Sequence, residues 1–495
     1  MDNPLLYATA LASAVLALYS YSVFRRRSSA IRDISGPPSP SWIFGHIRQL
    51  ILSAPYGAHE FKWLDVYGSV YALKGCFGQE RLMVADPLAL QHILNSPKFG
   101  RAPILDNTAS LLFGEGSVIT ASGGCILFSR RNRAYVDADV WTEAGSEHRR
   151  LRSALNMGFT AAAVRGYEPV FKRVAEKIAD QLEGFSTATD ICSVLSPATL
   201  EAISQAILGH PTQELGEDFV ANNIEIVKLT ASHSETHILA DAIGSYVPTW
   251  VWRAAIYLPT TGAAVARKER SFATQVGGRI VQEKIDAAEQ GLEMDNDLFS
   301  LILNPNPSDN TKTLSVEDII AQIALILIAG QETTARISLK ANALAFGLLE
   351  LARHREFQDE LRAEIYSNLG ANATNMAYEN MPLLNAFLKE TLRLYPAVPQ
   401  PDRMALEDTA IPLGESITTL KGERISRIPV RKGQLVTLAI ASYQRLASRW
   451  GVNPHEFNPS RWLDGKTNQG DAVGPYANLL SFLGGPKTCL GWRFA

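Results

Sequence analysis

One cysteine stands near the end of a glycine-rich stretch whose residue types could bind a metal. Residues 482–491 read Phe-Leu-Gly-Gly-Pro-Lys-Thr-Cys-Leu-Gly, with Cys489 seven residues after Phe482 and two after Lys487. Glycine lets the backbone approach a flat cofactor closely and adopt positive φ, and amide N–H groups that point at a sulfur stabilise its ionised form. Such a stretch could hold Cys489 as a thiolate ligand, although a cysteine in a glycine-rich turn taken alone is more often a small buried apolar side chain.

A second chemical feature interrupts the longest apolar segment. Ser315 and Asp318 predict a capping box, and the apolar run that follows predicts a helix of roughly 35 residues, about 50 Å long. Residues 329–334 in its middle read Ala-Gly-Gln-Glu-Thr-Thr. A carboxyl group in an apolar helix is costly, the small pair Ala329-Gly330 would let a bulky ligand press against the backbone, and the Thr333 hydroxyl could hold water or open a kink. The alternative is a buried pair that satisfies a helix bend.

Ionisable residues are paired at helical spacing in two further places. Glu390 and Arg393 lie three positions apart in a helix predicted at 382–394, which ends before Pro396. By itself such a pair often arises by chance. His148 and Arg152 share one helix face at a spacing of four residues.

The order of these motifs along almost the whole chain resembles the cytochrome P450 family. The cysteine stretch is similar to the family's haem-ligand signature, and residues 329–334 to its oxygen-activation motif. Glu390 with Arg393, followed by Phe-Asn-Pro-Ser-Arg-Trp at 457–462, is similar to its E-x-x-R and F-x-P-x-R-W segments. The resemblance implies a mainly α fold with a smaller β region (α+β), and haem b bound through a cysteine thiolate.

The resemblance also implies roles for individual residues. Cys489 would be the iron ligand, Thr333 the hydrogen-bonding relay, and Glu332 the group that feeds protons during oxygen activation. Glu390, Arg393 and Arg461 would form a structural network that braces the cysteine loop. The other implied haem contacts are the candidate propionate partners His148, Arg152, Arg403 and Lys487, with Phe482 beside the cofactor.

The activity implied by the family is insertion of one oxygen atom from O₂ into a hydrophobic organic substrate, in secondary metabolism or xenobiotic oxidation. Electrons would come from NADPH through a membrane-bound NADPH–cytochrome P450 reductase, with cytochrome b5 as a further candidate partner. One alternative is a haem-thiolate isomerase or dehydratase, which the acid–threonine pair Glu332-Thr333 argues against. A second alternative is an inactive, haemless remnant.

Composition and charge limit the partners and the cellular compartment that fit this activity. The 495 residues carry a formal net charge of −3, which gives no reason to expect nucleic acid as a partner. Four scattered cysteines without a C-x-x-C pair fit a reducing compartment. Residues 4–24 carry no charge and precede Arg25–Arg27, which predicts a transmembrane anchor at 1–24 rather than a signal peptide. We therefore expect a single-pass protein of the endoplasmic reticulum membrane with a cytosolic catalytic domain.

The remaining sequence predicts the layout of that domain. After a basic and Pro-rich linker at 25–45, the haem domain would span 46–495, with a β-hairpin at 67–84 and a strand-rich region at 411–441. Two features depart from the family. Residues of about 124–144 form an insert without a counterpart, for which a retained intron is one hypothesis. The chain also ends six residues after Cys489, where the family continues, so we expect that a C-terminal segment is missing.

Overall fold

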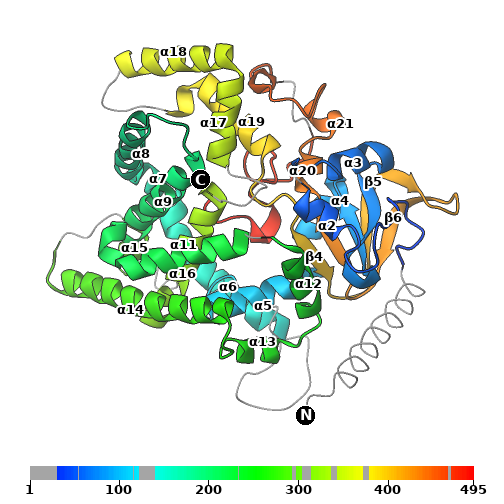
Figure 1. Ribbon diagram of the computed structural model, residues 1–495, viewed down its shortest axis with the longest axis horizontal. Coiled ribbons are helices and arrows are strands. Elements are labelled where there is room, and N and C mark those ends of the chain that lie inside the picture. Colours follow the sequence, from blue (N-terminus) through cyan, green and yellow to red (C-terminus); the bar gives the residue numbers. More distant parts are fainter. Residues whose placement is uncertain are drawn as a thin grey trace. The chain divides into compact units, whose positions relative to one another are not determined.

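The computed structural model describes most of the chain after the predicted anchor (Figure 1). The described residues are 30–53, 55–114, 116–121, 140–231, 233–292, 297–303, 314–335, 343–371, 378–465 and 470–495. The anchor at 1–24 and most of the insert lie outside these residues. Of the insert, only residues 140–144 are described, as the first turns of a helix.

Contacts divide the chain into two compact units, each built from separated segments. Unit 1 comprises Met1–Ala102, His233–Tyr246 and Leu392–Thr488, and unit 2 comprises Pro103–Ser232, Val247–Thr391 and Cys489–Ala495. One boundary falls between Thr488 and Cys489, inside the cysteine stretch. The two units are described separately below.

Unit 1 contains every described strand of the chain. A five-stranded sheet has the order β1-β2-β7-β4-β3, in which β2 and β7 are parallel and the other neighbours antiparallel; β5 and β6 form a second, antiparallel pair. The strands are β1 (Val70–Lys74), β2 (Glu80–Val84), β3 (Phe99–Arg101), β4 (Asp402–Ala405), β5 (Thr409–Thr418), β6 (Arg424–Val430) and β7 (Leu435–Leu438). Its helices are α2 (Ile47–Leu52), α3 (Glu60–Tyr67), α4 (Pro87–Asn95), α12 (Glu235–Gly244), α20 (Ile440–Tyr443) and α21 (Ala447–Trp450).

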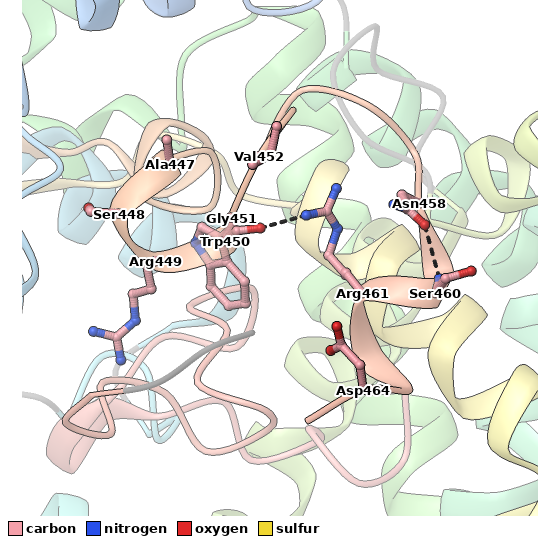
Figure 2. A pocket seen from close by; sticks show the side chains of 10 residues that line it. All are labelled: Ala447, Ser448, Arg449, Trp450, Gly451, Val452, Asn458, Ser460, Arg461 and Asp464. Carbon is pink, nitrogen blue, oxygen red and sulfur yellow. Dashed lines mark hydrogen bonds between the residues drawn. The ribbon is translucent and has the colours of Figure 1, made fainter. Parts of the chain in front are cut away.

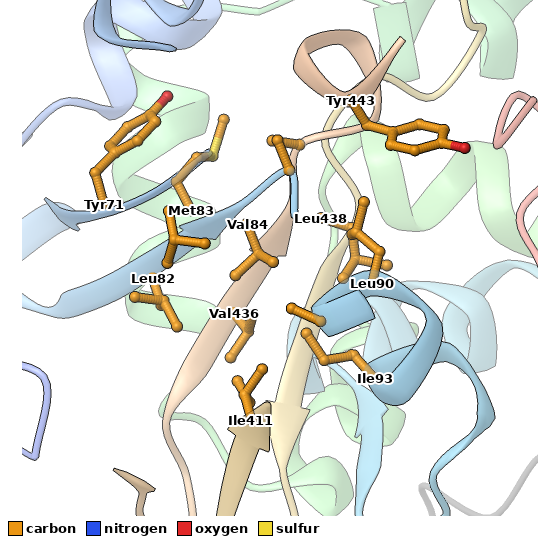
Figure 3. Packing of buried hydrophobic residues seen from close by; sticks show 14 of the residues in the cluster. Tyr71, Leu82, Met83, Val84, Leu90, Ile93, Ile411, Val436, Leu438 and Tyr443 are labelled. Carbon is orange, nitrogen blue, oxygen red and sulfur yellow. The ribbon is translucent and has the colours of Figure 1, made fainter. Parts of the chain in front are cut away.

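The core of unit 1 lies between the larger sheet, helix α4 and the β5–β6 pair (Figure 3). Leu82 of β2, Val436 of β7 and Ile411 of β5 are fully buried there, together with Leu90 and Ile93 of α4. Asp86 caps the start of α4, because its carboxylate accepts from the backbone N–H of Ala89 at 2.9 Å. This packing fixes the position of α4, whose C-terminal end contacts the cysteine loop.

Unit 2 is helical in its described residues. Its elements are α5 (Pro103–Phe113), α6 (Val140–Leu155), α7 (Ala161–Gly166), α8 (Glu168–Glu183), α9 (Ile191–Ile203), the π-helical turn η3 (Ser204–Leu208), α10 (Thr212–Leu215), α11 (Glu217–Ala231), α13 (Thr249–Ala255), α14 (Thr261–Glu289), α15 (Leu298–Leu303), α16 (Val316–Ala335), α17 (Ala343–Arg353) and α18 (Arg355–Ala371). Helix α19 (Pro382–Leu394) begins in unit 2 and ends in unit 1.

Helix α16 packs against α9 and α14 and supplies much of the apolar core of unit 2. The stretch Ile191–Leu208 is long and apolar enough to cross a membrane, with a mean hydropathy of 1.4, but 56% of it is buried in unit 2. Because it packs against α16, it is a core helix of this unit. It is also distinct from the anchor that the sequence predicts at 1–24.

Several predicted elements are confirmed. The hairpin at 67–84 is the antiparallel pair β1–β2, the strand-rich region contains β5, β6 and β7, and the helix predicted at 382–394 is α19. The capping box is present as well: Ser315 Oγ accepts from the N–H of Asp318 at 3.1 Å, and the Asp318 carboxylate accepts from the N–H of Ser315 at 3.2 Å. The predicted long helix is described as α16 and α17, because residues 336–342 lie outside the described part.

Candidate functional site

Cys489 begins the last segment of the chain, which is anchored in the core of unit 2. Leu490 and Phe494 pack against that core, and the Phe494 ring contacts the ring of Phe171 at a centroid distance of 5.0 Å. Cys489 is exposed, yet protein surrounds its sulfur closely enough that burial raises the pKa of the thiol. The sulfur is therefore enclosed on most sides and accessible on the remaining one.

Two groups lower the pKa of the Cys489 thiol, against the effect of burial. The backbone N–H of Gly491 donates a hydrogen bond to it, and the Arg152 guanidinium interacts with it electrostatically; both lower the pKa of the thiol, although the net direction remains upward. An amide donor is what the glycine-rich sequence predicts for a thiolate ligand. The chemistry around Cys489 therefore fits a sulfur that binds a metal in its ionised form.

Helix α6 brings both predicted basic residues of unit 2 onto one face. His148 and Arg152 are half-buried and lie one turn apart, whereas Arg149 is exposed. Burial lowers the pKa of Arg152, and the nearby Cys489 opposes that shift. Unit 2 thus brings Arg152 together with Cys489, as expected for a cation near the cofactor.

The Glu332-Thr333 pair lies in the last two turns of α16, but the side chains of residues 332–335 are outside the described part. Residues 322–328, earlier in the helix, are all buried, whereas Ala329 is exposed. The sequence predicts that Gly330 makes room for a ligand, but in the structure it makes room for a side chain of another helix. A Cβ built there would lie 1.8 Å from Cδ1 of Ile203 in α9, so this glycine permits close packing of two helices.

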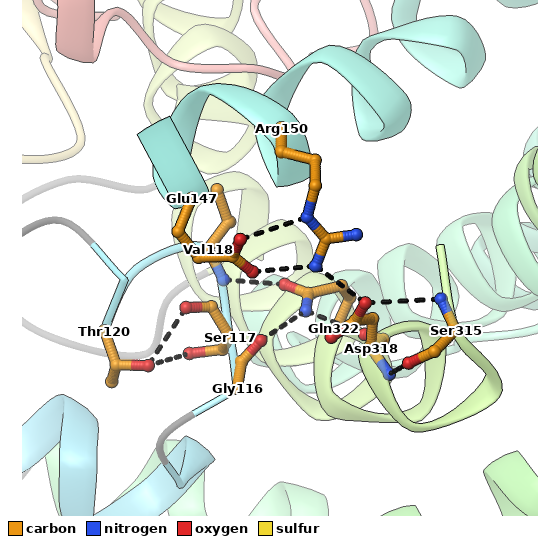
Figure 4. Close-up of polar contacts among 9 residues, drawn as sticks. All are labelled: Gly116, Ser117, Val118, Thr120, Glu147, Arg150, Ser315, Asp318 and Gln322. Atoms are coloured by element: carbon orange, nitrogen blue, oxygen red, sulfur yellow. Dashed lines mark hydrogen bonds and ion pairs between the residues drawn. The ribbon is translucent and has the colours of Figure 1, made fainter. Parts of the chain in front are cut away.

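A network of side chains fixes the first turns of α16 against α6 and the segment 116–121 (Figure 4). Arg150 of α6 donates to Glu147 at 2.8 Å and to Asp318 at 2.7 Å. The Gln322 amide donates to the carbonyl oxygen of Gly116 at 2.8 Å and accepts from the N–H of Val118 at 2.7 Å. Arg150 therefore has a structural role in this unit, and Gln322 holds a short segment against α16.

The other three predicted cofactor contacts belong to unit 1. Arg403 is buried in β4 and donates to the carbonyl oxygen of Asp402 at 3.1 Å. Phe482 is buried, and Lys487 is half-buried in the 3₁₀ turn η6 (Gly485–Lys487). Within unit 1, Phe482 and Lys487 share the cysteine loop, whereas Arg403 lies in the sheet.

The backbone of the cysteine loop depends on its two glycines. A Cβ at Gly484 would lie 2.2 Å from the carbonyl oxygen of Val473, and one at Gly485 would lie 2.6 Å from that of Leu94 at the end of α4. Gly485 has φ +68°, and the neighbouring Leu483 has φ +56°, a conformation that non-glycine residues rarely adopt. The loop is thus held in a specific shape by α4 and by the segment that contains Val473.

The two arginines of the network that the sequence predicts for Glu390, Arg393 and Arg461 donate hydrogen bonds to several backbone carbonyl groups. Glu390 and Arg393 lie one turn apart on α19, and both are fully buried. Arg393 donates to the carbonyl oxygens of Gln444 at 2.7 Å and Glu456 at 3.2 Å, and Arg461 donates to the carbonyl oxygen of Glu456 at 3.3 Å. The two arginines therefore fix the segment around 444–461, consistent with a structural role.

A surface pocket of about 450 Å³ lies beside Arg461 (Figure 2). Arg461 donates to the carbonyl oxygen of Trp450, and Asn458 Oδ1 accepts from the N–H of Ser460 at 3.1 Å. Among the predicted site residues, only Arg461 lines this pocket, whose other lining residues are Ala447, Ser448, Arg449, Trp450, Gly451, Val452, Asn458, Ser460 and Asp464. The lining therefore includes none of the predicted cofactor contacts.

The sequence analysis missed Gln444, which links the end of α19 to the segment that leads into the cysteine loop. Its amide contacts Arg393 on one side and Leu480 on the other, at 2.7 and 2.8 Å. No local motif marks this residue, because its partners lie 51 and 36 positions away in the chain. The E-x-x-R motif of Glu390 and Arg393 could have predicted only that residues at the end of α19 have buried partners.

An exposed cysteine with an amide donor and a nearby cation, carried after a glycine-rich loop in an α+β fold, fits the class of haem-thiolate proteins. The family model described as cytochrome P450 matches residues 121–495. The chain belongs to the cytochrome P450 family, and the predicted fold class is confirmed.

Curated fungal relatives support the same class. Cytochrome P450 monooxygenase claO of Ampulloclitocybe clavipes is 27% identical over 95% of this chain and 84% of its own length. Cytochrome P450 monooxygenase 212 of Postia placenta is 29% identical over 99% of this chain and 89% of its own length. These names support a monooxygenase, the class that we expected from the motifs, and they do not favour an isomerase or dehydratase.

Proposed function

We propose that this enzyme inserts one oxygen atom of O₂ into a hydrophobic organic substrate in secondary metabolism or xenobiotic oxidation. The observation that carries the proposal is the Cys489 sulfur, which receives the Gly491 amide hydrogen bond and the field of Arg152 in a chain of this family. We further propose that residues 1–24 anchor it in the endoplasmic reticulum membrane with the catalytic domain in the cytosol. Electrons would then come from NADPH through a membrane-bound reductase, with cytochrome b5 as an additional donor.

The sulfur of Cys489, with its amide donor and nearby cation, fits a ligand of haem b, and we give each predicted cofactor contact a proposed task. Cys489 would ligate the iron; Arg152, His148, Arg403 and Lys487 would hold the propionates, and Phe482 would lie against the cofactor. Bound haem supplies the redox chemistry that activates O₂. The protein's share is to orient the substrate, exclude water and hold protons.

Proton supply is the proposed task of Glu332 and Thr333. A carboxyl group next to a hydroxyl group in the last turns of α16 can pass protons inward, with Thr333 as the last hydrogen-bonding relay. The exposed Ala329, which follows the buried residues 322–328 and lies about one turn before the pair, supports an accessible position at this level of α16.

The spectrum of the reduced protein with carbon monoxide tests this function. Full-length protein expressed with its haem should give the red-shifted Soret band of thiolate-ligated haem, and product formation from a panel of lipophilic compounds should require both O₂ and a reductase. A protein with no haem absorption would be the haemless remnant, and a band only at the unshifted position would mean that haem is bound without the thiolate ligand. Turnover that proceeds without O₂ would instead favour the isomerase or dehydratase.

Thr333→Ala is expected to uncouple electron consumption from product formation. Without the relay hydroxyl, protons arrive at the wrong position or too slowly, so the product formed per NADPH should fall by roughly tenfold or more, and hydrogen peroxide should accumulate. Parallel assays of NADPH, product and peroxide measure this partition. Thr274→Ala, on the exposed face of α14, is the control, and full coupling in Thr333→Ala would remove this residue from the relay.

A further inference from the structure

The segment that leads into the cysteine loop is held by hydrogen bonds from two neighbouring residues of unit 1. Residues 478–481 precede the loop, and two consecutive side chains at the end of α20 contact them. The Tyr443 hydroxyl donates to the carbonyl oxygen of Asn478 at 2.9 Å, and the Gln444 amide oxygen accepts from the N–H of Leu480 at 2.8 Å. Tyr443 and Gln444 are both fully buried.

The same glutamine also completes the end of α19. Its amide nitrogen donates to the carbonyl oxygens of Leu392 at 3.1 Å and Arg393 at 2.7 Å. The last carbonyl groups of a helix have no partners within the helix, so the Gln444 amide supplies donors to two of these acceptors. The orientation of the amide follows, because carbonyl oxygens only accept and the Leu480 N–H only donates.

Two further contacts make this link reciprocal. Arg393 returns a hydrogen bond from its guanidinium to the carbonyl oxygen of Gln444 at 2.7 Å. The Ser481 hydroxyl donates to the carbonyl oxygen of Leu392 at 2.7 Å and lies 3.2 Å from the Gln444 amide oxygen. One buried amide thus connects the helix that carries the E-x-x-R motif with the chain nine residues before Cys489.

From these contacts we propose that Gln444, supported by Ser481, is a positioning residue for the cysteine loop. Its hydrogen bonds link the end of α19 to Leu480 and Ser481. This link limits the positions that the following loop, and with it the Cys489 sulfur, can adopt. Glutamine suits this task because its amide offers two donors and an acceptor in one plane. This inference rests on the proposed role of Cys489 as the haem ligand.

Gln444→Met tests the proposal in the full-length, haem-loaded protein. Methionine retains an unbranched stem of similar length but makes none of the hydrogen bonds. We expect hydrogen exchange at the Leu480 amide to accelerate about tenfold. We also expect a large share of the red-shifted band of the reduced carbon monoxide complex to move to the unshifted position, which reports loss of the thiolate ligand.

Gln434→Met is the matched control. The Gln434 amide also donates to two backbone carbonyl groups of unit 1, those of Glu80 at 2.9 Å and Leu435 at 3.1 Å, but it contacts the sheet instead of the approach to the loop. It should change neither Leu480 exchange nor the band, even if it lowers the melting temperature. An equal loss of the band in both variants would mean general destabilisation and would overturn the proposal.

Ser481→Ala keeps the proposal testable if Gln444→Met does not fold. It removes one hydroxyl group from the same link, so a smaller shift of the band in the same direction is expected. Wild-type exchange and a wild-type band in the folded variants would refute the positioning role alone. Absence of the red-shifted band from the wild-type protein would instead contradict the proposed function.

Discussion

Replacing Cys489 by serine is expected to abolish the red-shifted band of the reduced carbon monoxide complex completely. A serine hydroxyl does not ionise at neutral pH and is a poor replacement for a thiolate that donates charge to iron. The Gly491 amide and Arg152, which favour a negatively charged sulfur in the structure, would then face a neutral oxygen. Monooxygenase activity should disappear together with the band.

Cys192→Ser is the natural control for this experiment. Cys192 lies at the start of α9, is half-buried and, like Cys489, forms no disulfide. Its replacement should leave the spectrum and the haem content at wild-type values. If Cys489→Ser retained the red-shifted band, another side chain would have to be the ligand, and the assignment of Cys489 would be wrong.

The elements that the sequence predicted well are those whose limits are set locally. Helix α19 begins at Pro382 and ends before Pro396, because proline suits the first turn of a helix and disfavours helix in the residue before it. The capping box at Ser315 and the turn between β1 and β2 are equally local. Each of these is decided by side chains within a few residues of one another.

The features that the sequence did not predict depend on partners far apart in the chain. Gln444 contacts residues 51 and 36 positions away, and the missing Cβ of Gly330 accommodates Ile203 of a different helix. Arg393 belongs to a motif that was predicted, but its hydrogen bonds to the backbone carbonyl groups of Gln444 and Pro454 could not be read from that motif. The spacing of a motif in the sequence can indicate that a residue is buried and paired. Only the fold shows which residues are its partners.

A buried carboxyl group on α14 is another feature of this kind. Glu269 is fully buried against α11, where its carboxylate accepts from the Asn222 amide at 2.8 Å, 47 positions away in the chain. Its second oxygen has no hydrogen-bond partner among the described residues. Burial therefore dominates and raises the pKa of Glu269 from its ordinary value of 4.5 to about 7.

This shift predicts that the protein loses stability as the pH rises through neutrality. Because the folded state holds the proton more tightly than the unfolded state, the stabilisation is fully present below pH 4.5 and is lost as the pH rises to about 7. The corresponding loss in the free energy of unfolding is about 3 kcal/mol. Glu269→Gln, which resembles the protonated acid and does not titrate, should lack this part of the pH dependence.

Denaturant unfolding of both proteins between pH 5 and pH 8 measures the difference directly, because contributions from all other titrating groups cancel in the comparison. Glu289→Gln, at the exposed C-terminal end of the same helix, should follow the wild-type curve. Parallel curves for the wild type and Glu269→Gln would mean that Glu269 is already ionised in the folded state at pH 5. The pair with Asn222 would then hold a charge between α11 and α14, and the neutral carboxylic acid that burial favours would be ruled out.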